Sequence, residues 1–549
     1  MNQSDLPVGI VGAGPVGLTA AARLATFGIP TVILEADPAL LKQGSKACLI
    51  QGDVLEILDK FGCAEPINAE GVTWNVAHTY VRNKEIRAAV YPRRIGFGPF
   101  VNISQYRIEQ FLLARVEAQP LCQVRWSHRV VGLTQHSDHV TVEVSTPQGR
   151  VEHRFRYLIG CDGVRSEVRR LTGVAWTGYS HRDRFLITDI KAELPFAKDR
   201  HFHYDPPFNP GRQLVIHPQP DNVWRIDWQL PPDADIDAER RSGELDRRIR
   251  KVIGDVPYEI DWLSTYRFHQ RVVDRFRVGR VFLAGDAAHA LPPYGSRGMN
   301  SGIQDADNLA WKLARVLHGQ AGEDLLDTYH IERYAAAREN LAVTEATIRF
   351  MVPPSLARRV ARAVLLRLSH PLKSARRHVN SGRMAEPYVY IDSPIVDFSA
   401  PHPLLGSFAP DGWVDLDGRR ERIRRLFGQE FVGLYLGRDA AAAQRFVDRA
   451  LADGPARLVL VLTPEAAAGI APRDGVVVVT DGGDRLRADY HAEQPTWLLV
   501  RPDGHIAAAG GAGSGAGAGG AGFGDALRRC AGTAATTPDP APEPARISA

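Results

Sequence analysis

Hydrophobic and polar positions follow two alternating periods along this chain, and the alternation predicts an α/β protein. The apolar run Val8–Val11 is typical of a buried strand, residues 18–27 carry apolar side chains at helical spacing, and Thr31–Leu34 is a second, β-branched run. Because strand, helix and strand follow one another within about 30 residues, the pattern predicts a βαβ unit of a parallel sheet.

The same two periods predict the remaining elements. Helical spacing recurs at residues 53–61, 102–116, 303–317 and 327–350, and short strand patterns fill residues 80–100, 124–144 and 151–159. Residues 181–272 are mostly strand-like with proline-rich turns, which indicates an inserted sheet domain. We therefore predict a discontinuous Rossmann-type domain (residues 1–80, 101–180 and 273–395), a sheet domain (81–100 and 181–272), a C-terminal unit (396–530) and a disordered tail (531–549).

The C-terminal unit is predicted from apolar runs at residues 431–436, 458–462, 475–479 and 496–500. Residues 507–524 are rich in glycine and alanine, and we expect a flexible loop there. Residues 533–549 are rich in proline, alanine and threonine, so they bury little apolar surface and are expected to be disordered.

A basic amphipathic helix is predicted at residues 355–377, interrupted near Pro371. Such a helix either packs on the protein body with a solvated face or touches a membrane surface. We expect the first arrangement, and therefore no membrane partner.

Three glycines form the most informative turn of the chain. Gly12, Gly14 and Gly17 complete G-x-G-x-x-G between the first strand and the first helix. In this motif the first glycine permits the turn, the second admits a pyrophosphate and the third lets helix and strand pack closely. Glu35 ends the second strand about 20 residues on, where an acid accepts hydrogen bonds from ribose hydroxyls. The combination predicts a dinucleotide site rather than a plain glycine-rich turn.

The composition excludes several classes of protein. The 549 residues carry a net charge of +4 with the basic residues spread out, so nucleic-acid binding is not indicated. Five scattered cysteines without a C-x-x-C pair argue against a disulfide framework or a metal site. We find no signal-peptide pattern and no apolar window of about 18 residues, and we expect a cytoplasmic protein.

Two later motifs belong with the glycine turn. Asp162 and Gly163 follow a predicted strand, Asp286 ends another, and a glycine-rich segment around residues 298–300 opens the helix predicted at 303–317. Together the three motifs resemble those of the class A flavoprotein aromatic hydroxylases. The most specific strings are GCDGVRSEVRR (160–170) and GRVFLAGDAAHALPPYGSRGMNSGIQDADNLAWKLA (279–314), and the resemblance covers nearly the whole chain.

The resemblance implies that the Rossmann-type domain binds FAD. It also implies that the C-terminal unit, with FAPDGWVDLDG at 408–418, is thioredoxin-like, as in the phenol-hydroxylase branch. Because this unit has no C-x-x-C, we expect it to be redox-inactive and structural, with a homodimer contact as one role.

The resemblance also implies the cofactor contacts. Asp286 and Gln105 would touch the ribityl chain, and Lys46 stands where many relatives have an arginine beside the pyrophosphate. The helix N-terminus at 298–300 would face the flavin N1–C2=O edge. The alternatives are a helix-capping role for Asp286 and a plain turn at Asp162. The predicted contacts are Gly12, Gly14, Pro15, Val16, Gly17, Glu35, Lys46, Gln105, Asp162, Gly163, Asp286, Pro293, Gly298, Met299 and Asn300.

The substrate residues are predicted less directly. Arg297 follows a serine where many relatives have Gly-Gln, and it either binds a substrate carboxylate or the nicotinamide phosphates, or is a solvated arginine. In the sheet domain, alternation places Trp224, Ile226 and Trp228 on one face and Arg225, Asp227 and Gln229 on the other, and one of these faces is expected to line an aromatic pocket. The predicted catalytic residues are Arg297, His217, Asp227, Tyr266 and His269.

The activity implied by the resemblance is hydroxylation of a phenolic substrate by O₂. NADH or NADPH would reduce FAD, and the oxygen would reach the ring through a flavin C4a-hydroperoxide. Two alternatives stay open: a hydroxylase of a large polyketide or antibiotic, and a flavin-binding protein without hydroxylase activity.

Overall fold

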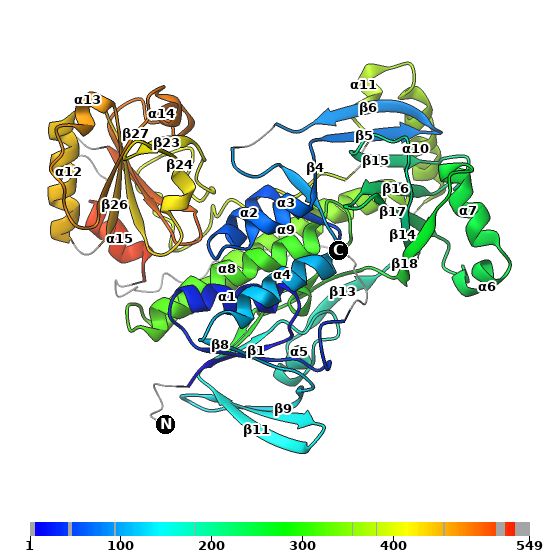
Figure 1. Ribbon diagram of the computed structural model, residues 1–549, viewed down its shortest axis with the longest axis horizontal. Coiled ribbons are helices and arrows are strands. Elements are labelled where there is room, and N and C mark those ends of the chain that lie inside the picture. Colours follow the sequence, from blue (N-terminus) through cyan, green and yellow to red (C-terminus); the bar gives the residue numbers. More distant parts are fainter. Residues whose placement is uncertain are drawn as a thin grey trace. The chain divides into compact units, whose positions relative to one another are not determined.

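A computed structural model describes residues 6–41, 47–92, 95–181, 183–353, 355–379, 382–453, 456–511 and 522–532. The chain divides into two compact units. Unit 1 comprises Met1–Ala314 and Tyr329–Tyr388, and unit 2 comprises Arg315–Thr328 and Val389–Ala549. Both units combine helices with sheets, which confirms the predicted α/β class (Figure 1).

A six-stranded sheet carries the glycine turn at the centre of unit 1. Its order is β20-β21-β12-β1-β2-β8, and the neighbours from β21 to β8 run parallel. Because parallel strands end at one edge, the turns after β1, β12 and β21 meet there. The strands are β1 (Val8–Val11), β2 (Thr31–Leu34), β8 (Cys122–Arg125), β12 (Leu158–Gly160), β20 (Arg277–Val278) and β21 (Val281–Leu283).

Helices of unit 1 follow the predicted pattern with one notable shift. The segment predicted as a helix from residue 303 is helical from residue 297. Glycines and serines in its first turns are weak helix formers, so their helical state is not visible from propensity. The helices are α1 (Pro15–Thr26), α2 (Gly52–Asp59), α3 (Ala64–Glu70), α4 (Gln105–Glu117), α5 (Glu167–Thr172), α8 (Arg297–Leu317), α9 (Asp327–Met351), α10 (Leu356–Leu368) and α11 (Lys373–Arg376).

The predicted sheet domain is a seven-stranded sheet in the order β18-β14-β17-β16-β15-β5-β6. It begins at residue 76, five residues before the predicted boundary. The segment 181–272 is also less uniform than predicted, because it contains two helices, α6 (Ile236–Arg241) and α7 (Glu244–Ile253). The strands are β5 (Val76–Val81), β6 (Lys84–Val90), β14 (Arg184–Lys191), β15 (Arg200–Tyr204), β16 (Gln213–Pro218), β17 (Val223–Leu230) and β18 (Glu259–Tyr266).

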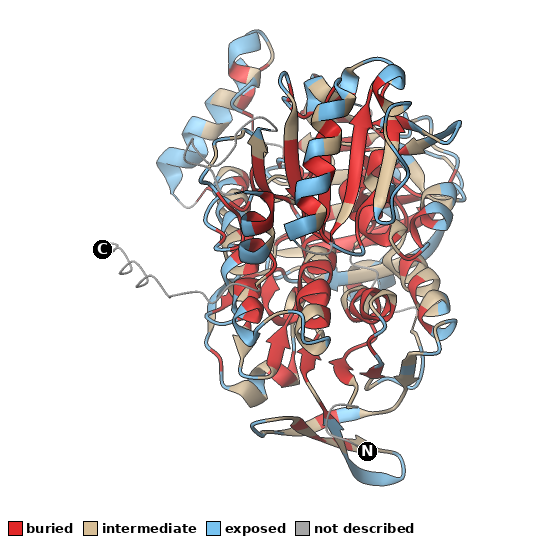
Figure 2. Cartoon of the chain, turned by 90° about the vertical axis from the view of Figure 1, so that its left-hand side faces the viewer, coloured by how far each residue is buried: buried red, intermediate tan, exposed pale blue. Residues whose placement is uncertain are grey.

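One face of this sheet forms an apolar core with α7. Trp224, Ile226 and Trp228 pack in the same cluster as Leu245 and Ile249 of the helix. The apolar face predicted from alternation is therefore core, and the opposite face carries the polar side chains of β17. Figure 2 shows the buried residues on the strands and inner helix faces, with exposed residues mainly on outer helix faces and loops.

Three small sheets complete unit 1. In the sheet β3-β7-β4 the strand β3 directly precedes α2, and β11-β10-β9 forms a meander. In the sheet β13-β19-β22 the strand β22 contacts the turn at Gly285–Ala287. The strands are β3 (Leu49–Gln51), β4 (Val72–Trp74), β7 (Phe100–Asn102), β9 (Arg129–Gln135), β10 (Val140–Thr146), β11 (Gly149–Phe155), β13 (Trp176–Ser180), β19 (His269–Val273) and β22 (His289–Ala290).

Unit 2 is built on a second seven-stranded sheet in the order β24-β23-β27-β26-β25-β28-β29. The thioredoxin-like assignment of this unit stays a prediction. Its strands are β23 (Trp413–Leu416), β24 (Arg419–Arg422), β25 (Val432–Leu436), β26 (Arg457–Leu462), β27 (Val476–Thr480), β28 (Thr496–Val500) and β29 (Ile506–Gly511), and its helices are α12 (Ala440–Asp453), α13 (Pro464–Ala467), α14 (Arg485–Asp489) and α15 (Phe523–Cys530).

Two predictions about the C-terminal region need correction. The flexible loop predicted from residue 507 is wrong for its first five residues, which form β29. Small side chains suit this strand, because a Cβ on Gly510 would lie 2.5 Å from the Trp497 ring. The predicted tail starts too early, since Ala531 is buried and its carbonyl accepts from Arg315. Residues 533–549 lie outside the described residues.

None of the described helices is long and apolar enough to cross a membrane. The described residues also contain no group of three or more metal-ligating side chains.

Candidate functional site

The glycine turn has one open position between two crowded ones. A Cβ on Gly12 would lie 2.6 Å from the carbonyl oxygen of Cys161, and a Cβ on Gly17 would lie 2.0 Å from that of Gly12. A Cβ on Gly14 would meet no atom within 4 Å. Gly12 and Gly17 are thus required by the fold, whereas Gly14 leaves space in front of the α1 N-terminus, where a pyrophosphate binds in dinucleotide motifs.

The turn after β21 packs against the start of α1. Gly285 and Gly302 both pack against the Val16 side chain, because a Cβ on either would approach a Val16 methyl within 3 Å. Asp286 is half-buried, and its Oδ1 would lie 3.8 Å from a Cβ on Gly298. The carboxylate therefore lies beside the first turn of α8, where the two motifs predicted to form one site meet. Met299 follows in the same turn, and Pro293 is exposed just before it.

Asn300 fixes that first turn to the short sheet. Its Oδ1 accepts from the Gln51 N–H at 3.0 Å, and its Nδ2 donates to the carbonyls of Leu49 (3.1 Å) and Ser296 (2.7 Å). The side chain is buried and occupied by backbone groups. Asn300 thus positions the helix N-terminus, and its predicted contact with a cofactor stays a prediction.

Asp162 caps a helix. Its carboxylate accepts from the N–H groups of Glu167 (2.7 Å) and Val168 (3.1 Å) and from the Ser166 hydroxyl. Burial raises the pKa of Asp162, and these hydrogen bonds oppose the rise. Gly163 adopts φ +74° in the same turn. The cofactor contact predicted for Asp162 and Gly163 stays a prediction.

Glu35 and Gln105, two predicted cofactor contacts, both lie near Glu109. Glu35 accepts from the N–H groups of Ala13 (2.7 Å) and Asp37 (2.9 Å), which ties the end of β2 to the glycine turn. Gln105 starts α4 and donates to Glu109 at 2.8 Å. Burial raises the pKa of Glu109 to about 7. Lys46 lies outside the described residues.

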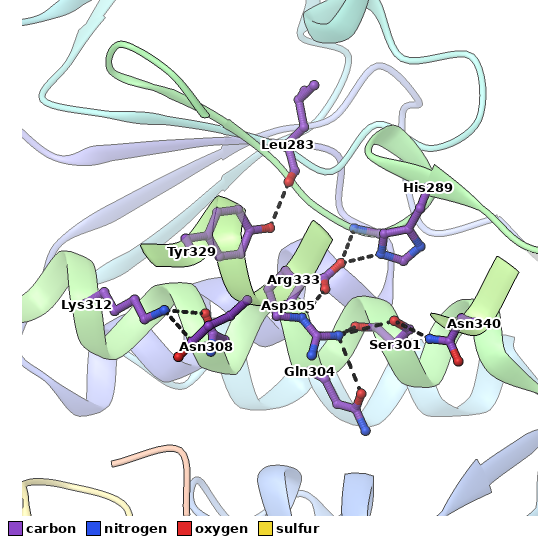
Figure 3. Close-up of polar contacts among 12 residues, drawn as sticks. Leu283, His289, Ser301, Gln304, Asp305, Asn308, Lys312, Tyr329, Arg333 and Asn340 are labelled. Atoms are coloured by element: carbon purple, nitrogen blue, oxygen red, sulfur yellow. Dashed lines mark hydrogen bonds and ion pairs between the residues drawn. The ribbon is translucent and has the colours of Figure 1, made fainter. Parts of the chain in front are cut away.

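A buried polar network, which the sequence analysis missed, holds the turn at Gly285 against α8 (Figure 3). Asp305 of α8 accepts from the Gly285 N–H at 3.0 Å, from His289 at 2.7 Å and from Arg333 at 2.6 Å. Burial alone would raise the pKa of Asp305, but the charges of His289 and Arg333 hold it below its ordinary value. The polar residues Asp305, Asn308 and Lys312 recur at helical spacing on one face of α8, and this pattern could have revealed the network from the sequence. In the same helix, Lys312 binds Glu332, and Asp307 binds Arg23 and Lys60.

The polar face of β17 carries a second charged cluster. Arg225 donates to both oxygens of Asp189 at 2.8 Å, and both side chains are buried. Asp227, two residues on, lies on the same face. Burial raises the pKa of Asp227 to about 7, against the lowering effect of Arg225.

Cys48 connects this cluster to the helix N-terminus. Burial raises the pKa of the Cys48 thiol to about 12, and the neighbouring Arg225 guanidinium opposes part of that rise. Cys48 directly precedes β3, the strand whose backbone is held by Asn300. The Asn102 side chain adds a second tie, since it donates to the Pro218 carbonyl at the end of β16. The polar face of β17 therefore borders the strand that holds the start of α8.

Several buried polar atoms around this border have no hydrogen-bond partner among the residues that the structure describes. They are Gln51 Oε1, His217 Nδ1, Asp227 Oδ1 and the Tyr294 hydroxyl. Unpartnered buried polar atoms are rare in folded proteins and are typical of ligand sites. Burial also raises the pKa of Tyr266 well above its ordinary value, and Asp227 and Tyr294 act in the same direction. Tyr294 lies within the string 279–314, which carries the family resemblance.

Arg297 is buried, unlike the solvated arginine that was one of its predicted alternatives. It is only 4% exposed, so the solvated interpretation is wrong. Its terminal nitrogens donate to the Asn340 side chain and to the carbonyls of Arg383 (3.0 Å) and Met384 (3.3 Å). Burial lowers the pKa of its guanidinium to about 10. In the structure Arg297 thus holds the segment after α11 against α8, and its predicted ligand contact stays a prediction.

The two histidines predicted as catalytic lie in different sheets. His217 is buried in β16, and burial holds its pKa well below the ordinary value, so it is neutral. His269 lies in β19, in the sheet β13-β19-β22, and its Nδ1 is 2.8 Å from the Ser180 hydroxyl across the strand pair. The structure groups His217 with Asp227 and Tyr266 in the seven-stranded sheet, and it places His269 in a separate one.

These features fit a flavin dinucleotide. The open Gly14 position and Asp286 beside the first turn of α8 come together where Val16 packs against Gly285 and Gly302. Residues 5–344 match a family described as "FAD binding domain", and residues 402–534 match "Aromatic-ring hydroxylase, C-terminal".

Named relatives agree with these families. A 3-(3-hydroxy-phenyl)propionate/3-hydroxycinnamic acid hydroxylase of Mycobacterium sp. (strain JLS) is 30% identical over 519 residues, which cover 92% of this chain and 90% of the relative. A 12-dehydrotetracycline 5-monooxygenase/anhydrotetracycline 6-monooxygenase of Streptomyces rimosus is 31% identical over 517 residues, which cover 90% of this chain and 94% of the relative.

Solved structures show the same fold. The OxyS anhydrotetracycline hydroxylase from Streptomyces rimosus has a TM-score of 0.70 at 28% identity, covering 96% of this chain and 99% of that one. The flavin-dependent monooxygenase PieE, in complex with FAD and substrate, has a TM-score of 0.79 at 23% identity and the same coverage. This chain therefore belongs to the FAD-binding aromatic-ring hydroxylases and is an FAD-dependent aromatic monooxygenase.

Proposed function

We propose that the protein hydroxylates a phenolic ring, with NADH or NADPH as reductant and O₂ as co-substrate, and that Asp227 accepts the phenol proton. The relative from Mycobacterium is named for substrates that carry a hydroxyphenyl group. One observation supports the assignment to Asp227: its Oδ1 is buried without a partner on the face that borders the α8 N-terminus. We further propose a cytoplasmic location and a homodimer, which rest on the sequence analysis.

Different residues of the chain would hold the cofactor and shield the reaction. FAD, when bound and reduced by NAD(P)H, supplies the electrons that activate O₂ for insertion into the ring. Gly14, Asp286 and the first turn of α8 would hold the dinucleotide, and the α8 N-terminus would favour negative charge on the flavin ring. On the polar face of β17, Arg225 and its partner Asp189 are buried, so this part of the sheet is shielded from solvent.

Asp227 suits the proton transfer by its acidity. A phenol resembles tyrosine, with a pKa of about 10. A base whose own pKa is near the working pH is the most effective general base. With a pKa of about 7, Asp227 meets this condition. The Arg225–Asp189 pair beside it fixes the orientation of β17 and keeps a positive charge close to the developing phenolate.

The test is NADH and NADPH oxidation by the purified enzyme with a panel of phenols, with hydroxylated product and hydrogen peroxide measured separately. We expect product formation to rise with pH through about 7, because the base must be deprotonated. Asp227→Asn should lower product formation by about a hundredfold or more and abolish that rise, without loss of FAD. The exposed Asp221→Asn is the matched control. An unchanged pH profile in Asp227→Asn would exclude this residue as the base.

A second candidate is hydroxylation of a large polycyclic substrate. The support is the 31% identity to the tetracycline-type monooxygenase and the match to the OxyS structure. Adding a polycyclic phenol to the same panel decides between the two: selective turnover of the polycycle favours the second candidate, and selective turnover of a hydroxyphenyl acid favours the first. NAD(P)H oxidation without product from any phenol would contradict both.

A further inference from the structure

The outward face of α10 is apolar, although it is exposed. Leu356, Val360, Val364 and Leu368 stand at i, i+4, i+8 and i+12, and their exposed fractions are 77%, 56%, 47% and 43%. Leu372, which continues the row past the helix end, is 48% exposed. These five account for more than a third of the 14 exposed large hydrophobic residues in the described chain. A row of this kind is not scattered surface and marks an interaction site.

The other side of α10 already has its partner. Leu366 is buried with Tyr204 and Phe202 in the core of the sheet domain, and Ser369 is fully buried. The exposed row is therefore not the core-facing stripe of an amphipathic helix. It is a second apolar face, opposite to the one that holds the helix on unit 1.

Positive charge surrounds this face. Residues 355–379 contain seven arginine and lysine residues and no aspartate or glutamate. Arg358, Arg359, Arg367, Lys373 and Arg377 are exposed. The neighbouring β5–β6 hairpin adds the positive charges of Arg82 and Lys84. Burial lowers the pKa of His370, and the charges of Lys84, Arg376 and Arg82 lower it further. Asp205, whose charge acts on Arg362 of α10, is paired with Arg82 at 2.9 Å.

We propose that α10 and α11 form a docking surface for a membrane rich in anionic lipid. A helix with an outward apolar row and basic flanks lies in the plane of the lipid interface, with its apolar side chains among the acyl chains and its cations at the headgroups. The surface lies at the end of unit 1 that carries β5, β6 and β15 (Figure 1). The proposal takes the membrane-surface alternative of the sequence analysis in place of our expectation of a solvated face.

Charge argues against a second copy of the chain as the occupant. A symmetric contact would bring the same basic surface of both copies together, with no acid in residues 355–379 to offset the repulsion. The proposal is independent of the hydroxylation reaction, since none of these residues belongs to the site described above.

The test is co-sedimentation of the FAD-loaded full chain with vesicles. We expect binding to vesicles that contain about one quarter phosphatidylglycerol, weak binding to phosphatidylcholine alone, and release at about 1 M salt, where charges are screened within about 3 Å. Val360→Asp with Val364→Asp should lower the partition coefficient about a hundredfold. The matched control is Ile331→Asp on α9, also exposed, which should bind as the unaltered protein does.

A second variant keeps the test independent of helix stability. Arg367→Gln, Lys373→Gln and Arg377→Gln together retain the apolar row and should lower binding to anionic vesicles about a hundredfold. Absence of binding by the unaltered protein, or equal loss in Ile331→Asp, would overturn the proposal. If the double aspartate variant changes the mass in sedimentation velocity while no form binds vesicles, the face is a contact between copies and the proposal is wrong.

Discussion

Asp286 is the side chain on which we expect FAD affinity to depend most. It lies beside the first turn of α8, where a charge-assisted hydrogen bond to the cofactor is worth about 1.5–3 kcal/mol. Asp286→Ala should therefore weaken FAD binding about tenfold to a hundredfold, as measured by flavin fluorescence titration. Asp162→Ala is the comparison, because that carboxylate caps α5 and its loss should lower the melting temperature more than the affinity. Equal affinity in Asp286→Ala and the unaltered enzyme would make Asp286 structural.

Asp227 also makes a prediction about stability. Its pKa is about 7 in the folded protein against an ordinary value of 3.8, so the folded state binds the proton more tightly than the unfolded state. The contribution of Asp227 to the free energy of unfolding is therefore largest below pH 3.8 and is lost as the pH rises to about 7. Urea unfolding from about pH 4 to about pH 8 should show the unaltered protein losing stability relative to Asp227→Asn. A difference independent of pH would mean that Asp227 is ionised throughout.

At the scale of elements, two substitutions in the glycine turn distinguish an effect on folding from an effect on FAD binding. Gly17→Ala would place a Cβ 2.0 Å from the Gly12 carbonyl oxygen and should unfold or strongly destabilise unit 1. Gly14→Ala meets open space, so unfolding in urea should change by no more than about 1 kcal/mol. FAD titration should nevertheless show weaker binding in Gly14→Ala, because the methyl group occupies the approach of the pyrophosphate. Unchanged FAD affinity would place the cofactor elsewhere.

The pairing of α8 with α9 depends on buried charge. Asp305→Asn leaves Arg333 and His289 without their anion, and breaking a buried pair in this way costs about 3–5 kcal/mol. Urea unfolding measures the loss, which should be far larger than that of Glu244→Gln in the exposed pair with Arg247, because water screens that pair. Equal effects of the two substitutions would show that the network is not tightly coupled.

For the whole molecule, the end of the ordered chain can be located by truncation. Removal of residues 533–549 should leave activity unchanged and shift the melting temperature by no more than about 1 °C, since the segment has few large apolar side chains to bury. Removal from residue 523 also deletes α15, with the buried Phe523, Ala526 and Cys530, and should unfold unit 2. A shift of several degrees in the shorter deletion would mean that the tail packs on the protein.

Much of the fold was readable because it depends on neighbours in sequence. The strands Val8–Val11 and Thr31–Leu34 have the predicted bounds, since a continuous apolar run fixes a buried parallel strand locally. The glycine motif could be read from the sequence in the same way, because its glycines are needed for a turn or a close backbone approach within the same βαβ unit. The helix α7 was also encoded, by Leu245, Ile249 and Ile253 at helical spacing, but the surrounding strand patterns concealed it.

Partners distant in sequence were decided by tertiary structure alone. Arg297 is buried because Asn340 and the carbonyls of residues 383–384 surround it, and no spacing rule brings those segments together. Asp227 comes close to Cys48, far away in sequence, because Arg225 and Asp227 share the polar face of β17, whereas His269 belongs to another sheet. The outward apolar face of α10 follows the same rule: periodicity determined that the helix is amphipathic, but only packing decided which apolar side chains the core would cover and which it would leave exposed.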